Sequence, residues 1–317
     1  MPPIATNCSP EPFLDQNRAA VKRDLRQKTA FVFDGGGSLG AVEVGMLKAL
    51  TSYGVQADFV VGSSVGALNA AFFAGEPTAD GVGHLERIWL GVRRRDVFPI
   101  GPLRGFLGFF SWRDHLLDPT PLRRLIERNI QYRRLEEARI PCHVVATDLM
   151  GGGDIRFSSG PAVEIILASA AIPALFPPVR IGERYLIDGG IVNNSPISSA
   201  VELGATRVIV LPTGFSCSIE QPPRGVLAMA LHASNLLVAR QLVLDARRFA
   251  DQVELIVVPP LCPLAVSSYD FSRTRELIDG AANRTQRWLD KGGLAAQGIP
   301  RMLARGGRTA EIASRPA

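Results

Sequence analysis

The stretch Phe59–Ala71 (FVVGSSVGALNAA) decides how the rest of the chain is interpreted. It begins as a buried apolar strand, passes through the pattern Gly-x-Ser-x-Gly and continues as small, helix-compatible residues. This order predicts a strand, a sharp turn and a helix, with Ser64 held outward on a strained backbone between Gly62 and Gly66. A hydroxyl at a helix N-terminus is suited to act as a nucleophile. The five residues alone are equally consistent with a capped helix that has no chemical role.

A glycine-rich turn precedes this stretch. The strand Thr29–Phe33 leads into Asp34–Gly40 (DGGGSLG) and then into the helical pattern Ala41–Tyr53. The loop satisfies Gly-x-Gly-x-x-Gly, which is also the pattern of dinucleotide sites. A dinucleotide site needs an acidic residue after the second strand, whereas Asp58 comes before it. We therefore interpret the loop as a source of backbone amides.

Consecutive glycines allow neighbouring amides to point into one concavity. In this loop the amides are those of Gly36, Gly37 and Ser38. Such a group of N–H donors is an oxyanion hole when a nucleophile such as Ser64 faces it.

A serine nucleophile needs a base, and the chain offers few candidates. Of four histidines, only His232 follows Asp188, as the order Ser, Asp, His of the α/β-hydrolases requires, but it lies within a helical pattern. Asp188 ends the strand Arg184–Ile187 and is followed by Gly189 and Gly190, which leave room around it. We predict that Asp188 takes the serine proton directly.

Taken together, these motifs resemble those of the patatin-like phospholipase family. The resemblance runs from about Phe31 to Leu211 and rests on four segments: Asp34–Gly40, Gly62–Gly66, Ala168–Pro173 before Phe176–Pro178, and Asp188–Gly190 with Asn194 and Pro196 behind it. It implies an α/β fold, a three-layer α/β/α sandwich with a mainly parallel central sheet. It also implies hydrolysis of acyl esters of lipids through an acyl-enzyme, without metal or cofactor.

The resemblance assigns a role to each matching residue. Ser64 is the nucleophile and Asp188 the base of a Ser-Asp dyad. The oxyanion hole is assigned to Gly35, Gly36, Gly37 and Ser38, and a structural role to Gly40, Gly62, Gly66, Gly189 and Gly190. Leu39 stands where the family often has Arg or Lys, which leaves the choice between phospholipid and neutral ester open.

Length and composition predict one large domain. The chain has 317 residues, of which 46% are hydrophobic, enough for a sizeable core. We expect a disordered leader over 1–28, the acyl hydrolase domain over 29–291 and a flexible tail over 292–317. Four scattered cysteines and the lack of an apolar run of spanning length predict a cytoplasmic protein.

The positive charge is concentrated in one region. Between His84 and Arg139 there are twelve arginines and seven acidic residues, a difference equal to the net charge of +5. An apolar stretch overlaps this region, so residues 93–113 are predicted to contact an anionic membrane. Aromatic residues do not alternate with the basic ones on a strand, and nucleic acid is not expected as a partner.

Two other functions remain open from the sequence. Acyl-carrier transacylases share an elbow serine on a related core, but they keep a histidine where Ser63 stands. A nucleotide-binding regulatory module would use Gly35–Gly40 without any reaction at Ser64.

Overall fold

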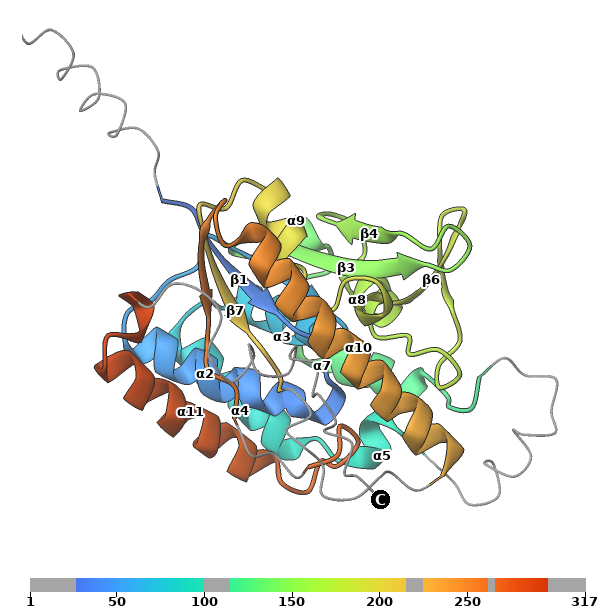
Figure 1. The fold of residues 1–317 in the computed structure, drawn as a ribbon. Helices are drawn as coiled ribbons and strands as arrows, with labels where there is room; N and C mark the ends of the chain where they lie inside the picture. Colours follow the sequence, from blue (N-terminus) through green and yellow to red (C-terminus); the bar gives the residue numbers. More distant parts are fainter. Residues whose placement is uncertain (1–26, 100–114, 215–224, 262–265, 296–317) are drawn as a thin grey trace, which may run out of the picture.

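The computed structural model describes residues 27–99, 115–214, 225–261 and 266–295 (Figure 1). Most of the predicted leader and tail lies outside these residues. Lys28 at the end of the predicted leader is bonded to the domain, because its backbone N–H donates to Thr206 Oγ1 at 2.9 Å. The described part of the predicted tail includes the 3-10 helix η4 (Gly293–Ala295).

A twisted sheet forms the middle of the domain. Its strands are β1 (Thr29–Phe33), β2 (Phe59–Ser63), β3 (Cys142–Asp148), β4 (Asp154–Phe157), β5 (Val179–Ile181), β6 (Arg184–Asp188), β7 (Arg207–Leu211) and β8 (Glu254–Val257). The strand order is β5-β6-β3-β2-β1-β7-β8, with β4 also paired to β3. The neighbouring strands in β3-β2-β1-β7-β8 all pair in parallel. The pairs β3-β4, β3-β6 and β5-β6 are antiparallel. The predicted mainly parallel sheet is confirmed.

Helices cover both faces of the sheet (Figure 1). The described helices are α2 (Gly40–Ser52), α3 (Val65–Gly75), α4 (Ala79–Gly91), α5 (Arg94–Val97), α7 (Thr120–Asn129), α8 (Ala162–Ser169), α9 (Ile197–Glu202), α10 (Val226–Phe249) and α11 (Thr274–Asp290), with 3-10 turns η1 (Gly37–Leu39), η2 (Leu135–Glu137) and η3 (Gly189–Ile191). Alternate residues of β1 point to opposite faces of the sheet, and each face is covered by its own helices. Phe31 and Phe33 pack in the core with α2, α3 and α11, whereas Ala30 and Val32 pack with α9 and α10. The expected three-layer sandwich is confirmed.

The start of α7 differs from the prediction. The pattern Asp118–Pro121 predicts Thr120 as the N-cap and a helix from Leu122, but the helix begins at Thr120 and Pro119 is its N-cap. The Thr120 N–H donates to Asp118 Oδ1 at 2.9 Å, so the aspartate carboxylate satisfies this amide. The short strand β5 is not predicted by the sequence either, since three residues carry too little alternation.

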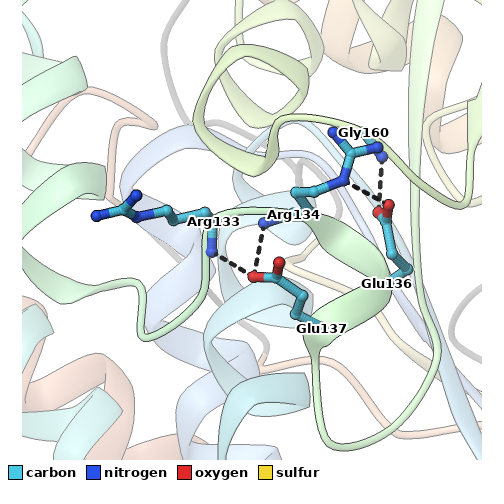
Figure 2. A network of polar contacts seen from close by, with 5 residues as sticks. All are labelled: Arg133, Arg134, Glu136, Glu137 and Gly160. Atoms are coloured by element: carbon cyan, nitrogen blue, oxygen red, sulfur yellow. Dashed lines mark hydrogen bonds and ion pairs between the residues drawn. The ribbon is translucent and has the colours of Figure 1, made fainter.

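Polar contacts around η2 fix the connection between α7 and β3 (Figure 2). Glu137 accepts from the backbone amides of Arg133 at 3.0 Å and Arg134 at 3.2 Å. Glu136 accepts from Arg134 Nε at 2.6 Å and from the Gly160 amide at 2.8 Å. These bonds tie η2 to the turn that precedes α8, the helix that delivers Ser169 to the site described below.

Close contact between α2 and α11 depends on Gly45. A Cβ atom at this position would lie 2.2 Å from the Ile278 carbonyl oxygen and 2.8 Å from Ala281 Cβ. We expect Gly45→Ala to lower the free energy of unfolding by about 1–3 kcal/mol, because the two helix backbones must move apart. Urea unfolding measures this. In Gly91→Ala, where a Cβ would meet nothing within 4 Å, the change should stay under about 1 kcal/mol. Equal stability of the two variants would contradict the helix packing.

Candidate active site

The predicted elbow is present at Ser64. Ser64 follows β2, is the N-cap of α3 and has φ 55° and ψ −126°, a strained conformation for a residue with a side chain. A Cβ on Gly62 would lie 2.3 Å from the Gly66 carbonyl oxygen, and one on Gly66 would lie 2.4 Å from that of Phe33. Strand, turn and helix therefore approach so closely that both positions need glycine.

Ser169 locks the elbow from α8. Its Oγ accepts a hydrogen bond from the Ser64 backbone N–H at 2.9 Å and donates one to the Val145 carbonyl at 2.5 Å. Ser169 is fully buried, so its hydroxyl satisfies the Ser64 amide where water cannot. Ser169 lies in one of the segments that carry the family resemblance, but its role cannot be predicted from the sequence, because its partners come from the end of β2 and from β3.

Ser64 and Asp188 are in direct contact. Ser64 Oγ donates to Asp188 Oδ2 at 2.6 Å, and the Gly190 N–H donates to Asp188 Oδ1 at 2.8 Å. Both side chains are buried. Burial raises the pKa of Asp188 to about 6, and the hydrogen bonds from Ser64 and Gly190 oppose that rise. A carboxylate with this pKa is ionised near neutral pH and can accept a proton from the hydroxyl.

The strand register explains how Asp188 reaches Ser64. Ser63 is paired with Val145 in β3, and Ala146, the next residue of β3, is paired with Asp188 of β6. The pairing between β3 and β6 is antiparallel, so the strand that Asp188 ends is not one of the parallel strands of the sheet. It reaches the active-site edge because β6 pairs only with the last three residues of β3.

The glycine-rich loop lies against Ser64. A Cβ on Gly35 would come within 3.1 Å of Ser64 Cβ. Of the four residues predicted for the oxyanion hole, Gly35 donates its amide to the Asn194 carbonyl at 3.3 Å and Ser38 donates to the Ser268 carbonyl at 2.8 Å. Within the described part of the chain, the Gly36 and Gly37 amides donate no hydrogen bond. Of the amides predicted for the oxyanion hole, these two are the ones without a partner among the described residues.

Ser268 belongs to a segment that the sequence analysis did not connect with the site. The Ser38 hydroxyl donates to the Ser267 carbonyl at 3.0 Å, so the side chain and the backbone of Ser38 both bind this segment. Tyr269 of the same segment feels the charge of Asp188: burial raises the pKa of Tyr269 to about 12, and this charge contributes to the rise. No local pattern could indicate the contact between Ser38 and this segment, because Ser38 and Ser267 are 229 positions apart.

Buried polar contacts hold both ends of the loop. Glu43 Oε1 accepts from the Asp34 amide at 2.7 Å, and Glu43 Oε2 accepts from Asn69 Nδ2 at 2.7 Å. Asn69 also donates to the Gly40 carbonyl at 2.9 Å and accepts from Trp89 Nε1 at 2.8 Å. Asn69 lies on α3, the helix that Ser64 caps, so the start and the end of the loop are both tied to this helix. Burial raises the pKa of Glu43 well above its usual range.

An apolar pocket opens beside Ser64. Its volume is about 590 Å³ including the open mouth, and Leu68, Phe72, Trp89, Phe98 and Phe271 contribute to its walls. Phe271 stacks on Trp89 with ring centroids 6.3 Å apart and lies 6.1 Å from Phe98. The walls are almost entirely apolar and therefore favour an apolar ligand.

The other candidate groups lie elsewhere. His232, the alternative base, is on α10, and no histidine takes part in the described contacts of Ser64 and Asp188. Among the described residues, no group of three or more His, Cys, Asp or Glu side chains could hold a metal ion. None of the described helices combines the length and apolar character needed to cross a membrane.

Comparison with known proteins places the chain in a family. A family model described as patatin-like phospholipase matches residues 31–201, which is more than half of the chain. The chain is 28% identical over 187 residues to patatin-like phospholipase domain-containing protein 6 of Mus musculus, a match that covers 58% of this chain and 13% of the mouse protein. It is 30% identical over 179 residues to an uncharacterized NTE family protein of Mycobacterium tuberculosis, with 56% of this chain and 29% of that protein covered.

A solved structure of human GIVD cytosolic phospholipase A2, in complex with methyl gamma-linolenyl fluorophosphonate, matches with 12% identity and a TM-score of 0.48. The match covers 91% of this chain and 62% of that one. From the family model, the chain belongs to the patatin-like phospholipase family, which confirms the resemblance seen in the sequence.

The pKa of Asp188 predicts how a reaction at Ser64 depends on pH. Only the ionised carboxylate can take the serine proton, so with a pKa of about 6 kcat/KM should rise with pH through about 6 and fall about tenfold per pH unit below it. Hydrolysis of a water-soluble ester between pH 4.5 and 8.5 measures this. Circular dichroism at each pH verifies that the protein stays folded. A rate that stays constant down to pH 4.5, as expected for an exposed aspartate, would contradict the assignment.

Proposed function

We propose that this protein is a serine hydrolase that cleaves carboxylic esters of lipids with a Ser64-Asp188 dyad. The observation that carries the proposal is the hydrogen bond of 2.6 Å from Ser64 Oγ to Asp188 Oδ2, beside an apolar pocket. Membership of the patatin-like phospholipase family supports a lipid ester as the substrate.

The reaction proceeds through an acyl-enzyme. Asp188 takes the proton from Ser64 Oγ as this oxygen attacks the ester carbonyl carbon, and the negative charge on the carbonyl oxygen is stabilised by the Gly36 and Gly37 amides. When the intermediate collapses, the carbon–oxygen bond to the alcohol breaks and Asp188 returns the proton to the leaving oxygen. Water, deprotonated by the same carboxylate, then attacks the acyl-enzyme and releases the acid and Ser64.

The pocket supports an acyl chain as the group bound next to the nucleophile. Ser64, Gly37 and Asn69 line the pocket, and the other lining residues are almost all apolar. An ester with its carbonyl at Ser64 can bury its acyl chain among Leu68, Phe72 and Phe98. This burial is favourable because it removes the apolar surface of the chain from water.

Two alternatives differ in ways that can be measured. An acyltransferase would form the same acyl-enzyme and pass the acyl group to another alcohol or thiol, so the products of the second step separate it from a hydrolase. A nucleotide-binding module would use Gly35–Gly40 and would give no adduct on Ser64 with a fluorophosphonate.

Membrane contact through residues 93–113 stays a prediction. Residues 100–114 lie outside the described part of the chain. Arg93, Arg94 and Arg95 are exposed around the short helix α5, where they are free to meet anionic head groups.

Substitution of the dyad tests the proposal. Ser64→Ala should abolish ester hydrolysis, because no other group can form the acyl-enzyme, and Asp188→Asn should lower kcat by about 10³-fold or more. His232→Ala should cost less than about tenfold, and Ser63→Ala should retain activity. Full activity of the Ser64 variant, or a larger loss in the His232 variant than in the Asp188 variant, would overturn the assignment.

The length of the acyl chain tests the role of the pocket. A methylene transferred from water into an apolar site contributes about 0.8 kcal/mol, so kcat/KM should rise up to about fourfold per methylene. p-Nitrophenyl acetate, butyrate and octanoate provide the series, with the Ser64→Ala protein as the blank. An enzyme that hydrolyses all three equally well would show that the acyl chain does not enter the pocket.

A further inference from the structure

Thr213 lies level with the glycine-rich loop. Strands β1 and β7 are parallel and their last residues are paired, so the residues two positions further on, Gly35 and Thr213, come side by side. On the other side of β1, its last residue Phe33 is paired with Gly62 of β2. Two positions further along each strand, Ser64 therefore comes level with Gly35. The loop therefore leaves β1 between Ser64 on one side and Thr213 on the other.

The Thr213 side chain holds the carbonyl group of Gly35. Thr213 is buried, and its Oγ1 donates to the Gly35 oxygen at 2.8 Å; Asn194 Nδ2 makes a longer bond of 3.4 Å to the same oxygen. In a trans peptide, C=O and N–H point in opposite directions. The N–H of this peptide belongs to Gly36, and it is therefore turned away from Thr213, toward the side on which Ser64 lies.

The backbone alone does not fix this direction. The peptide is flanked by Gly35 and Gly36, which have no Cβ atoms to resist its rotation. Larger residues cannot supply the stiffness, because a Cβ on Gly36 would lie 2.3 Å from Thr213 Oγ1 and one on Gly35 would lie 2.3 Å from Asn194 Oδ1. A hydrogen bond from outside the loop has to hold the peptide instead.

We propose that Thr213 is a positioning residue, which holds the Gly35–Gly36 peptide so that the Gly36 amide faces the oxyanion formed at Ser64. The inference rests on the proposed function, since the direction of this amide matters to a reaction only if an oxyanion forms there. Thr213 touches neither the dyad nor the substrate in this role. Its sequence context, a proline and a threonine after a buried strand, gives no sign of it.

Paired substitutions at one position test the proposal. Thr213→Val keeps the shape of the side chain and removes the hydroxyl, whereas Thr213→Ser keeps the hydroxyl. Loss of an oxyanion donor costs about 10²–10³ in kcat, and a misdirected donor costs part of that, so we expect kcat to fall about 10- to 100-fold in the valine variant. KM should stay within about twofold of wild type, and the serine variant should retain most of its kcat, because only the hydroxyl is needed.

The control is Thr285→Val, an equivalent replacement at a buried threonine of α11 outside the site, which should leave kcat unchanged. Wild-type kcat in Thr213→Val, or equal losses in the valine and serine variants, would overturn the positioning role and leave the hydrolase intact. Should Thr213→Val not fold, Thr213→Ala against Thr213→Ser gives the same comparison.

Failure of the proposed function has a different signature: wild type and Ser64→Ala would show the same background rate of hydrolysis. In that case, crystal structures of wild type and Thr213→Val decide the inference. A rotated Gly35–Gly36 peptide in the variant supports it, and an unchanged peptide overturns it.

Discussion

The site depends on one buried hydrogen bond, from Ser64 Oγ to Asp188 Oδ2. The bond joins two turns that are 124 positions apart in the chain, and each turn is held by its own constraints. Glycines around Ser64 let α3 pack against the end of β1, and Ser169 satisfies the backbone amide of the strained residue. Asp188 is held by the Gly190 amide and by a bond of 2.9 Å from Thr147 Oγ1 to its carbonyl. Ser64 and Asp188 can meet only when β2, β3 and β6 are in register.

Burial changes the chemistry of Asp188. Among the described contacts of Asp188 there is no cation, so burial raises its pKa to about 6 while leaving it ionised at neutral pH. A carboxylate buried in this way is a stronger base than an exposed one, which is what the proposed dyad requires, since it contains no imidazole. Glu43 is a second buried carboxyl group near the site. This carboxyl is buried beneath the glycine-rich loop, and it is compensated by donors from Asp34 and Asn69 that also fix the loop.

Most of the fold and the centre of the site could be predicted because their signals are local. Alternation in Thr29–Phe33, the glycine pattern around Ser64 and the pair Gly189–Gly190 each report a backbone requirement within a few residues. The details that were missed come from contacts between distant segments. β6 is antiparallel to β3, and the Ser38 amide is bonded to Ser268 rather than left open to substrate.

Short segments of the chain were enough to indicate the class of fold, the elbow serine, the carboxylate opposite it and the loop between them, because glycine spacing and apolar periodicity are local properties. Contacts between distant segments set which loop amides are bonded within the protein, which residues hold the loop and where the apolar pocket lies. These contacts depend on strand register. Thr213, Gly35 and Ser64 come into one row only because β7, β1 and β2 pair in parallel with matched ends, a relation that no single stretch of the chain contains.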